Sequence, residues 1–168
     1  MNRKLLEVTI VAAVSFIVWN EVNVTTTESN TERAITYSSY INIDGNVVSL
    51  DEFKGRYVWA DYAAEWCSYC TPQTKTIKSL DRNIGDKILF ITVVTGTNEV
   101  MKPPTVESAK SWAKRFNLDP KKVLAKFSTD TLPYHILYAP SGDILYQGSG
   151  LYNEKKITEI IKKYTPVL

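Results

Sequence analysis

The stretch YAAEWCSYCTPQ, from Tyr62 to Gln73, contains the only two cysteines of the 168-residue chain, Cys67 and Cys70. It follows a compact apolar run, YVWADY, and leads into a segment with helical periodicity. Residues three positions apart are neighbours on a helix surface, so the two sulfurs are expected to lie close together. Three uses fit such a pair: a disulfide that cycles between oxidised and reduced forms, half of a metal site, or a structural staple.

The expected position of the pair, after a buried strand and at the start of a helix, favours redox chemistry. A helix N-terminus carries unpaired N–H groups and about half a positive charge, which stabilise a thiolate. We therefore expect this environment to lower the pKa of the Cys67 thiol. Cys70, one turn further along, is placed to attack a mixed disulfide formed at Cys67. The sequence thus predicts Cys67 as the nucleophile and Cys70 as the resolving thiol.

Asp61 is an acidic residue inside the apolar run, six positions before Cys67. Burial of a carboxyl raises its pKa, so Asp61 is expected to bind and release a proton near neutral pH. From beneath the helix start it would accept the proton of Cys70 during resolution. The alternative is a structural acid at a strand edge or in a hydrogen-bond network. The neighbouring strand, ILFITVV, contains no lysine to pair with it.

The residues next to the cysteines are candidates for substrate binding and for tuning. Trp66 directly precedes Cys67 and is predicted to shield the site and contact substrate, the alternative being an ordinary core residue. Ser68 and Tyr69 lie between the two sulfurs and are predicted to tune the reduction potential. For Tyr69, an inert surface aromatic is the alternative.

A second candidate substrate contact is the proline of TLPYHILY, Pro133. Proline cannot donate a hydrogen bond within a sheet, so it belongs at a strand start or at a bend. Either a trans proline opens the strand, or the Leu132–Pro133 bond is cis, a rare and usually retained feature. A cis bond would leave the backbone of Leu132 unpaired and available to a substrate peptide. The residues alone leave both alternatives open.

The order of elements predicts an α/β domain with a mixed central sheet flanked by helices on both faces. An N-terminal β-hairpin is expected to turn at residues 44–46, where Asp-Gly-Asn supplies turn chemistry. The remaining expected elements are a strand at 57–62, a helix from about 67 to 83, a strand at 87–94, a helix at 105–116, a hairpin at 134–150 and a helix capped by Asn153.

The first 33 residues differ in composition from the rest of the chain. Residues 1–19 begin with the basic MNRK and continue with a 15-residue, largely apolar run, which predicts a signal anchor or a signal peptide. A soluble N-terminal helix is the third alternative. The basic N-terminus orients the rest of the chain away from the cytoplasm. Residues 20–33 are polar and threonine-rich, as in a linker, and the folded domain is expected at 34–168.

Composition excludes several other classes. The chain is 44% hydrophobic and 23% charged, with a net charge of +2 and no basic stripe, so nothing in it indicates nucleic-acid binding. Two cysteines form no disulfide framework, and they are too few for a four-ligand structural zinc site. The sole histidine, His135, leaves one metal alternative: a copper-binding metallochaperone that uses Cys67, Cys70 and His135.

In combination, these segments resemble a known family. ADYAAEWCSYC (60–70) is similar to the active-site segment of thioredoxins. DGNVVSLDEFKGRYV (44–58) and LPYHILYAPSGDILYQGSG (132–150) resemble the opening hairpin and the cis-proline strand of membrane-anchored TlpA/ResA-type thioredoxins, which include the reductants of cytochrome c maturation. The resemblance covers about residues 34–164. It implies a thioredoxin-like fold, a cycling Cys67–Cys70 disulfide without a bound cofactor, Asp61 as the buried acid and Pro133 in cis.

The chain departs from this family in three places. The dipeptide between the cysteines is Ser-Tyr, where thioredoxin has Gly-Pro, and a tyrosine before the second cysteine resembles disulfide isomerases with more oxidising potentials. Pro72 follows Cys70 by two residues instead of five, so a helix starting at Cys67 would lose a hydrogen bond and bend there, unless its first turn is irregular. The stretch between Phe116 and Pro133 is shorter than usual, so its inserted strand is expected to be reduced or lost.

The resemblance implies an extracytoplasmic, periplasmic-side thiol–disulfide oxidoreductase that acts on protein thiols and disulfides. Its N-terminal segment would hold it at the inner membrane, where a membrane protein would supply or accept its electrons. A reductant is the leading interpretation, with cytochrome c maturation or exported thiols as examples of its targets. A disulfide oxidant or isomerase is the alternative.

Overall fold

The computed structural model describes residues 40–128 and 130–168. The predicted membrane segment 1–19, the linker 20–33 and the first residues of the predicted domain lie outside this part. Within it, no helix has the length and the apolar character needed to cross a bilayer. The elements are β1 (Tyr40–Asn42), β2 (Val47–Val48), a 3-10 helix (Leu50–Phe53), β3 (Val58–Ala64), α1 (Cys70–Ile84), β4 (Leu89–Gly96), α2 (Val106–Phe116), a 3-10 turn (Pro120–Lys122), β5 (Val123–Ala125), β6 (Tyr134–Tyr138), β7 (Ile144–Ser149) and α3 (Glu154–Tyr164).

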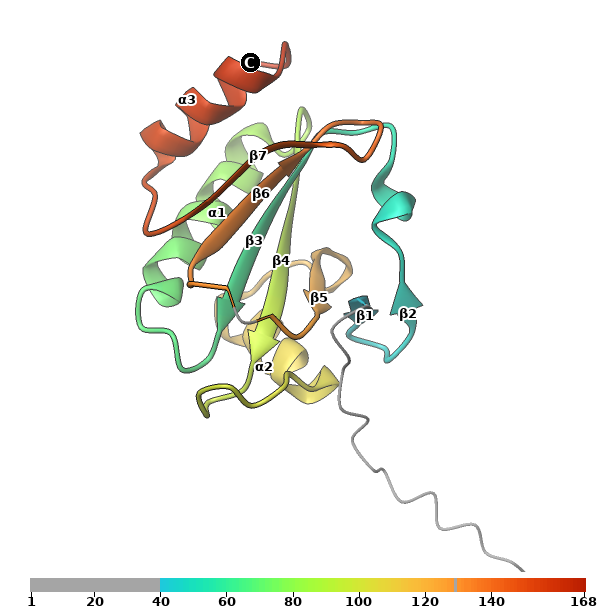
Figure 1. Cartoon of the computed structure of the whole chain (residues 1–168), viewed down its shortest axis with the longest axis vertical. Coiled ribbons are helices and arrows are strands. Elements are labelled where there is room, and N and C mark those ends of the chain that lie inside the picture. Colours follow the sequence, from blue (N-terminus) through green and yellow to red (C-terminus); the bar gives the residue numbers. More distant parts are fainter. Residues whose placement is uncertain (1–39, 129) are drawn as a thin grey trace, which may run out of the picture. The chain divides into compact units, whose positions relative to one another are not determined.

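The strands form one mixed sheet in the order β2-β1-β5-β4-β3-β6-β7 (Figure 1). The three central strands β5, β4 and β3 are parallel, and every other pairing is antiparallel. The predicted mixed α/β sheet is confirmed. The inserted strand is reduced but present: β5 has three residues and joins β4 to β1.

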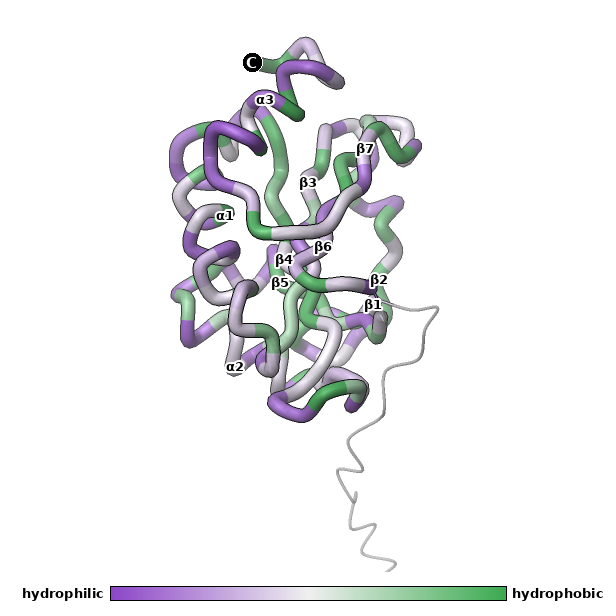
Figure 2. The backbone as a smooth tube through the Cα atoms, turned by 60° about the vertical axis from the view of Figure 1, so that its left-hand side comes forward, coloured by the Kyte–Doolittle hydropathy of each residue, from purple (hydrophilic) through white to green (hydrophobic). Residues whose placement is uncertain are grey.

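All three α-helices cover the same face of the sheet. Side chains alternate between faces along a strand, and on β3 Trp59 packs against residues of α1 and α3 while Ala63 packs against residues of α2. Figure 2 shows the three helices together on one side of the sheet. The chain steps from β3 to β4 to β5 in one direction, and right-handed crossovers place both connecting helices on one face. The prediction of helices on both faces was wrong for this reason.

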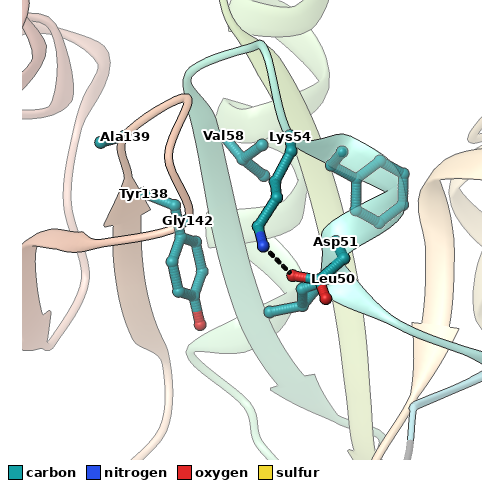
Figure 3. A pocket seen from close by; sticks show the side chains of 8 residues that line it. Leu50, Asp51, Lys54, Val58, Tyr138, Ala139 and Gly142 are labelled. Carbon is teal, nitrogen blue, oxygen red and sulfur yellow. Dashed lines mark ion pairs between the residues drawn. The ribbon is translucent and has the colours of Figure 1, made fainter.

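The opposite face of the sheet packs against the N-terminal part of the domain. Val58, Ala60 and Tyr62 of β3 point to this side, where Tyr40 and Val48 of the β1–β2 pair and the 3-10 helix cover them. A small cavity of about 50 Å³ lies here, between the 3-10 helix and the β6–β7 turn (Figure 3). It lies beside the first residue of β3, so about 20 Å of strand separates it from the strand end that leads to the cysteines.

The helix ends follow local sequence signals. Thr105 and Ser108 form a reciprocal capping box at the start of α2, and Asn117 ends that helix in the left-handed conformation, with φ 50°. The side chain of Asn153 accepts a hydrogen bond from the Lys156 N–H at 2.9 Å, which confirms the predicted cap of α3.

Candidate active site

Cys67 and Cys70 form a disulfide at the edge of the sheet where the parallel strands end. Strand β3 ends at Ala64, a turn follows, and α1 begins at Cys70. The Cα atoms of the two cysteines are 5.3 Å apart. Cys67 is 5% exposed and Cys70 is fully buried, so the first cysteine is the one that solvent reaches.

The helix begins three residues later than predicted, and Pro72 explains this. Proline has no N–H to donate, so it is tolerated in the first turn of a helix but not further in. With α1 starting at Cys70, Pro72 is its third residue, where an N–H would have no partner within the helix. The predicted start at about Cys67 was therefore wrong, and the bend expected of a helix that starts there does not arise. Cys67 lies in the preceding turn, where its N–H donates to the Ala64 carbonyl at 3.1 Å.

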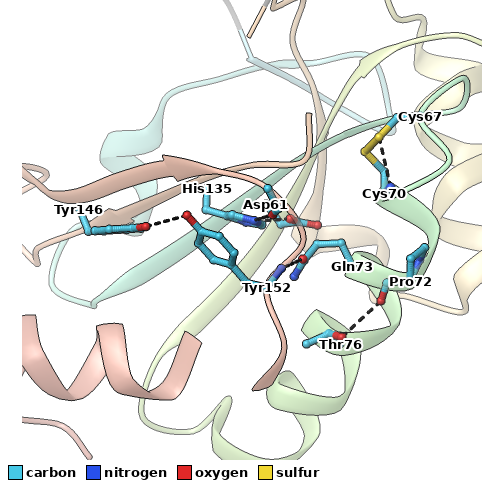
Figure 4. A network of polar contacts seen from close by, with 10 residues as sticks. Asp61, Cys67, Cys70, Pro72, Gln73, Thr76, His135, Tyr146 and Tyr152 are labelled. Atoms are coloured by element: carbon cyan, nitrogen blue, oxygen red, sulfur yellow. Dashed lines mark hydrogen bonds and ion pairs between the residues drawn. A yellow bond between two sulfur atoms is a disulfide. The ribbon is translucent and has the colours of Figure 1, made fainter. Parts of the chain in front are cut away.

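Cys67 still faces the N-terminus of α1. The backbone N–H of Cys70 donates to the Cys67 Sγ at 3.2 Å (Figure 4). Among the described residues this is the one hydrogen bond to that sulfur. The same N–H, together with the positive end of the helix dipole, stabilises negative charge on Cys67 when the disulfide opens.

Trp66 and Tyr69 present apolar surface around the disulfide. Trp66 is 37% exposed and Tyr69 is 64% exposed, and Ser68 between them is also exposed. Trp66 lies over Gly96 at the end of β4: a Cβ on this glycine would be 3.0 Å from the indole Nε1. The predicted residues next to the cysteines are thus all on the surface except the cysteines themselves.

The Leu132–Pro133 peptide bond is cis, as the family resemblance implies. Pro133 is buried and directly precedes β6, and its carbonyl accepts a hydrogen bond from the Gly150 N–H at 2.8 Å. Leu132 is half-buried and packs against the cluster that contains both cysteines. Neither backbone group of Leu132 has a hydrogen-bond partner among the described residues.

Asp61 lies fully buried in the middle of β3, on the face that the helices cover. It sits between Trp59, which packs under the middle of α1, and Ala63, which packs in the cluster with the cysteines. In this view it lies between His135 and the disulfide (Figure 4). Burial is the main cause that raises the pKa of Asp61, and His135 opposes this effect.

The partner of Asp61 is His135 on β6, directly opposite it in the antiparallel register. The His135 Nδ1 is 3.1 Å from the Asp61 Oδ1, close enough for an ion pair although away from the angle of a well-formed hydrogen bond. The imidazole is also fully buried, and its ring lies against Tyr152 and Trp59 with centroid separations of 4.6 and 5.5 Å. This pairing with a histidine of β6 was not predicted; the partner considered was a lysine on the neighbouring strand.

Gln73 and Tyr152 also belong to this buried polar network and were not predicted. The Gln73 side-chain carbonyl accepts the Tyr152 backbone N–H at 2.7 Å, which ties the second turn of α1 to the segment before α3. Tyr152 and Tyr146 join through their hydroxyls at 2.8 Å. The sequence feature that could have indicated Gln73 is its position one turn after Cys70, on the inner side of an amphipathic helix.

The structure does not assemble the copper site considered from the sequence. Within residues 40–128 and 130–168, no group of three histidine, cysteine or acidic side chains is arranged to hold a metal ion. His135 instead directs Nδ1 to Asp61 and Nε2 to the Gly150 carbonyl. Both ring nitrogens are thereby engaged away from the sulfurs.

No family model matches the chain, and no curated protein matches it. Solved structures do. The pneumococcal exposed lipoprotein thioredoxin Etrx1 of Streptococcus pneumoniae is 21% identical, over 74% of this chain and 97% of that one, with a TM-score of 0.58. DsbF of Mycobacterium tuberculosis is 14% identical over 77% and 96%, with a TM-score of 0.61. A secreted disulfide oxidoreductase of the same organism, described as homologous to Escherichia coli DsbE, is 10% identical over 76% and 96%, with a TM-score of 0.57.

The chain has the thioredoxin-like fold. These likenesses extend over nearly the full length of each solved structure, so the shared part is a whole domain.

Proposed function

We propose that this protein is a thiol–disulfide oxidoreductase that exchanges its Cys67–Cys70 disulfide with protein substrates. The observation that carries the proposal is the asymmetry of the pair: Cys67 meets solvent while Cys70 is fully buried at the first residue of α1. An incoming substrate reaches the Cys67 sulfur first, while the Cys70 sulfur is buried behind it. A structural staple has no need of this difference.

In the reducing direction, the Cys67 thiolate attacks a sulfur of the substrate disulfide. A bond forms between Cys67 and that sulfur, and the other substrate sulfur leaves as a thiolate. The Cys70 N–H and the N-terminus of α1 stabilise the attacking thiolate before this step. The product is a mixed disulfide between Cys67 and the substrate.

Cys70 then resolves the mixed disulfide. Its thiol gives up a proton, its sulfur attacks the Cys67 sulfur, and the bound substrate sulfur leaves as a thiolate. The substrate has gained two electrons and the protein is oxidised. Asp61, buried beneath the start of α1, is the proposed acceptor of the Cys70 proton.

The surface around Cys67 supports a polypeptide substrate. The strongly exposed apolar side chains here are Trp66 and Tyr69, and the loop after β4 adds Val100 and Met101, which are 68% and 58% exposed. Because β3 and β4 are parallel, both loops leave the sheet at the same edge. The unpaired backbone groups of Leu132 are proposed to hydrogen-bond an extended substrate segment, as a strand adds to a sheet edge.

Ser68 and Tyr69, between the sulfurs, are proposed to tune the reduction potential.

We further propose an extracytoplasmic, membrane-anchored protein of the TlpA/ResA type that acts as a reductant fed by a membrane electron donor. The apolar run within residues 1–19 and the linker at 20–33 support the anchor. Two similar structures come from proteins described as exposed and as secreted. A single N–H donor to the Cys67 sulfur stabilises the thiolate only modestly, which favours a reducing potential because strong oxidants stabilise their reduced form.

Trapping tests the activity and the two cysteine roles together. We expect Cys70→Ser to accumulate mixed disulfides with protein substrates, because the attacking sulfur remains and the resolving one is gone. Cys67→Ser is the matched control and should trap none. Equal trapping by the two variants, or none by either, would contradict the proposed function.

A further inference from the structure

Asp61 and His135 form a buried pair whose protons the geometry restricts. The His135 Nε2 lies 3.0 Å from the Gly150 carbonyl oxygen. A carbonyl can only accept, so Nε2 carries a hydrogen. The other ring nitrogen, Nδ1, faces the Asp61 Oδ1 at 3.1 Å. Two lone pairs at this distance repel, so one of the two atoms carries a hydrogen, either the nitrogen or the oxygen.

The second carboxylate oxygen of Asp61, Oδ2, is buried and has no hydrogen-bond partner among the described residues. An unpaired carboxylate oxygen in the interior costs free energy, so it requires a reason. Asp61 lies on the face of β3 that α1 covers. The next residue of the strand on that face, Ala63, packs in the cluster that contains Cys70. Oδ2 is therefore a base on the helix-covered face of β3, next along the strand to a residue of this cluster, without a hydrogen-bond partner in the described part of the chain.

We propose that His135 is a positioning residue that holds Asp61 Oδ1 and keeps the carboxylate ionised, so that Oδ2 accepts the Cys70 proton during resolution. This inference rests on the proposed function and assigns the proton step of the same site to a pair. The proton passes from the Cys70 Sγ to Oδ2 as the Cys70–Cys67 bond forms and the substrate thiolate leaves. It then returns to solvent or to that thiolate, which restores the pair.

Among the described residues, His135 is the group that forms an ion pair with Asp61. From β4, Asp61 is paired with Thr92, and from α1 the polar neighbour is Gln73. Tyr152 lies against the imidazole and shares a hydroxyl hydrogen bond with Tyr146, and burial and this bond raise the pKa of Tyr146 well above its ordinary value. Thr92 also lines a cleft of about 270 Å³, whose charged residues are Lys78, Asp81, Arg82, Asp119 and Lys122. Of these, Lys122 and Asp81 form an ion pair at 2.8 Å.

The pH profile of the resolution step tests the role of His135. The wild type and His135→Gln are each loaded at Cys67 with a peptide disulfide, and the release of the peptide thiol is followed by stopped flow from pH 5 to 9. Glutamine can still donate to the Gly150 carbonyl, but it cannot counter the Asp61 charge. The Asp61 pKa then rises further, so release at pH 7 should slow at least about tenfold and recover at higher pH.

Tyr146→Phe is the matched control, because it removes a hydrogen bond from the same network without touching Asp61. It should keep the wild-type profile. His135→Gln with an unchanged profile would overturn the role of His135 while leaving the proposed function intact. A wild-type protein that forms no mixed disulfide at any pH would overturn the proposed function and, with it, this inference.

A second test, by NMR, keeps His135 in place and so does not require that a His135 variant folds. His135 is the only histidine of the chain, so ¹⁵N-histidine labelling gives one pair of ring signals. We expect Nε2 to be protonated in the oxidised and reduced protein, and the Nδ1 signal to shift on Asp61→Asn while Nε2 keeps its proton. An unprotonated Nε2, or an Nδ1 signal indifferent to Asp61→Asn, would overturn the pairing.

Discussion

At the scale of single residues, the site depends on one carboxyl group in an apolar interior. Asp61 has apolar neighbours before and after it on β3 and is fully buried. A carboxyl group in such a place needs a polar partner. The His135 Nδ1, from the adjacent strand, lies 3.1 Å from the Asp61 Oδ1. In the proposal above, this pair holds the base that accepts the Cys70 proton.

Asp61→Asn should slow resolution by Cys70 about 100-fold while leaving the initial attack by Cys67 nearly unchanged, because only the second step has to remove a proton from a buried thiol. Single-turnover kinetics with a fluorescent peptide disulfide separate the two steps. Asp81→Asn, which changes an acid on α1 that pairs with Lys122, is the control and should alter neither step. Equal losses in both steps would make Asp61 a structural residue.

The same substitution should change how stability depends on pH. Burial raises the pKa of Asp61 above its unfolded value of about 3.9, so the native state binds more protons than the unfolded state once the pH exceeds that value. The wild type therefore loses stability as the pH rises through this window, and Asp61→Asn does not. Thermal melts at pH 8 should show the variant more stable by about 1–3 kcal/mol, with a smaller difference at pH 3.5. A difference independent of pH would contradict the raised pKa.

The residues that the sequence identified are those whose chemistry depends on local spacing. Cys67, Cys70 and Asp61 stand at fixed separations within one strand and the turn that follows it. His135 was noticed only as a lone histidine, because its pairing with Asp61 depends on the register between β3 and β6. That register is set by strands more than 70 residues apart, and no local pattern states it. The contact between Gln73 and Tyr152 likewise joins segments that are far apart in the sequence.

At the scale of elements, Pro72 fixes where α1 starts. Pro72→Ala should change the free energy of unfolding by less than about 1 kcal/mol, because the third helical residue has no N–H partner within the helix. Lys75→Pro, an exposed position one turn further in, should cost about 3 kcal/mol or more. Urea unfolding of the two variants measures both values. A large loss in Pro72→Ala would show that α1 needs its proline for another reason.

Element types were predictable from the sequence, while their layering was not. The buried strands, the capped helices and the β6–β7 hairpin follow from apolar periodicity and turn residues. The placement of α1 and α2 on one face depends on the order of β5, β4 and β3 across the sheet. That order depends on the pairing of β5 with β4. Because β5 has only three residues, its sequence gives little indication of a strand.

At the scale of the whole molecule, the parts form a thioredoxin-like domain whose disulfide lies at the edge of the sheet where the parallel strands end. Exposed apolar side chains lie near Cys67, and the backbone of Leu132 has no hydrogen-bond partner among the described residues, while the acid–histidine pair is buried. In the proposed function, the exposed groups contact the substrate and the buried pair accepts a proton.

The reduction potential of the Cys67–Cys70 pair shows whether the disulfide cycles and in which direction electrons flow. Residues 34–168 are equilibrated with glutathione or dithiothreitol buffers, and the oxidised fraction is read by alkylation and mass spectrometry. We predict a reversible two-electron couple near or below about −250 mV, the range of protein reductants. A value above about −180 mV would contradict the reductant and indicate an oxidant or isomerase, and a pair that does not cycle would contradict the activity altogether.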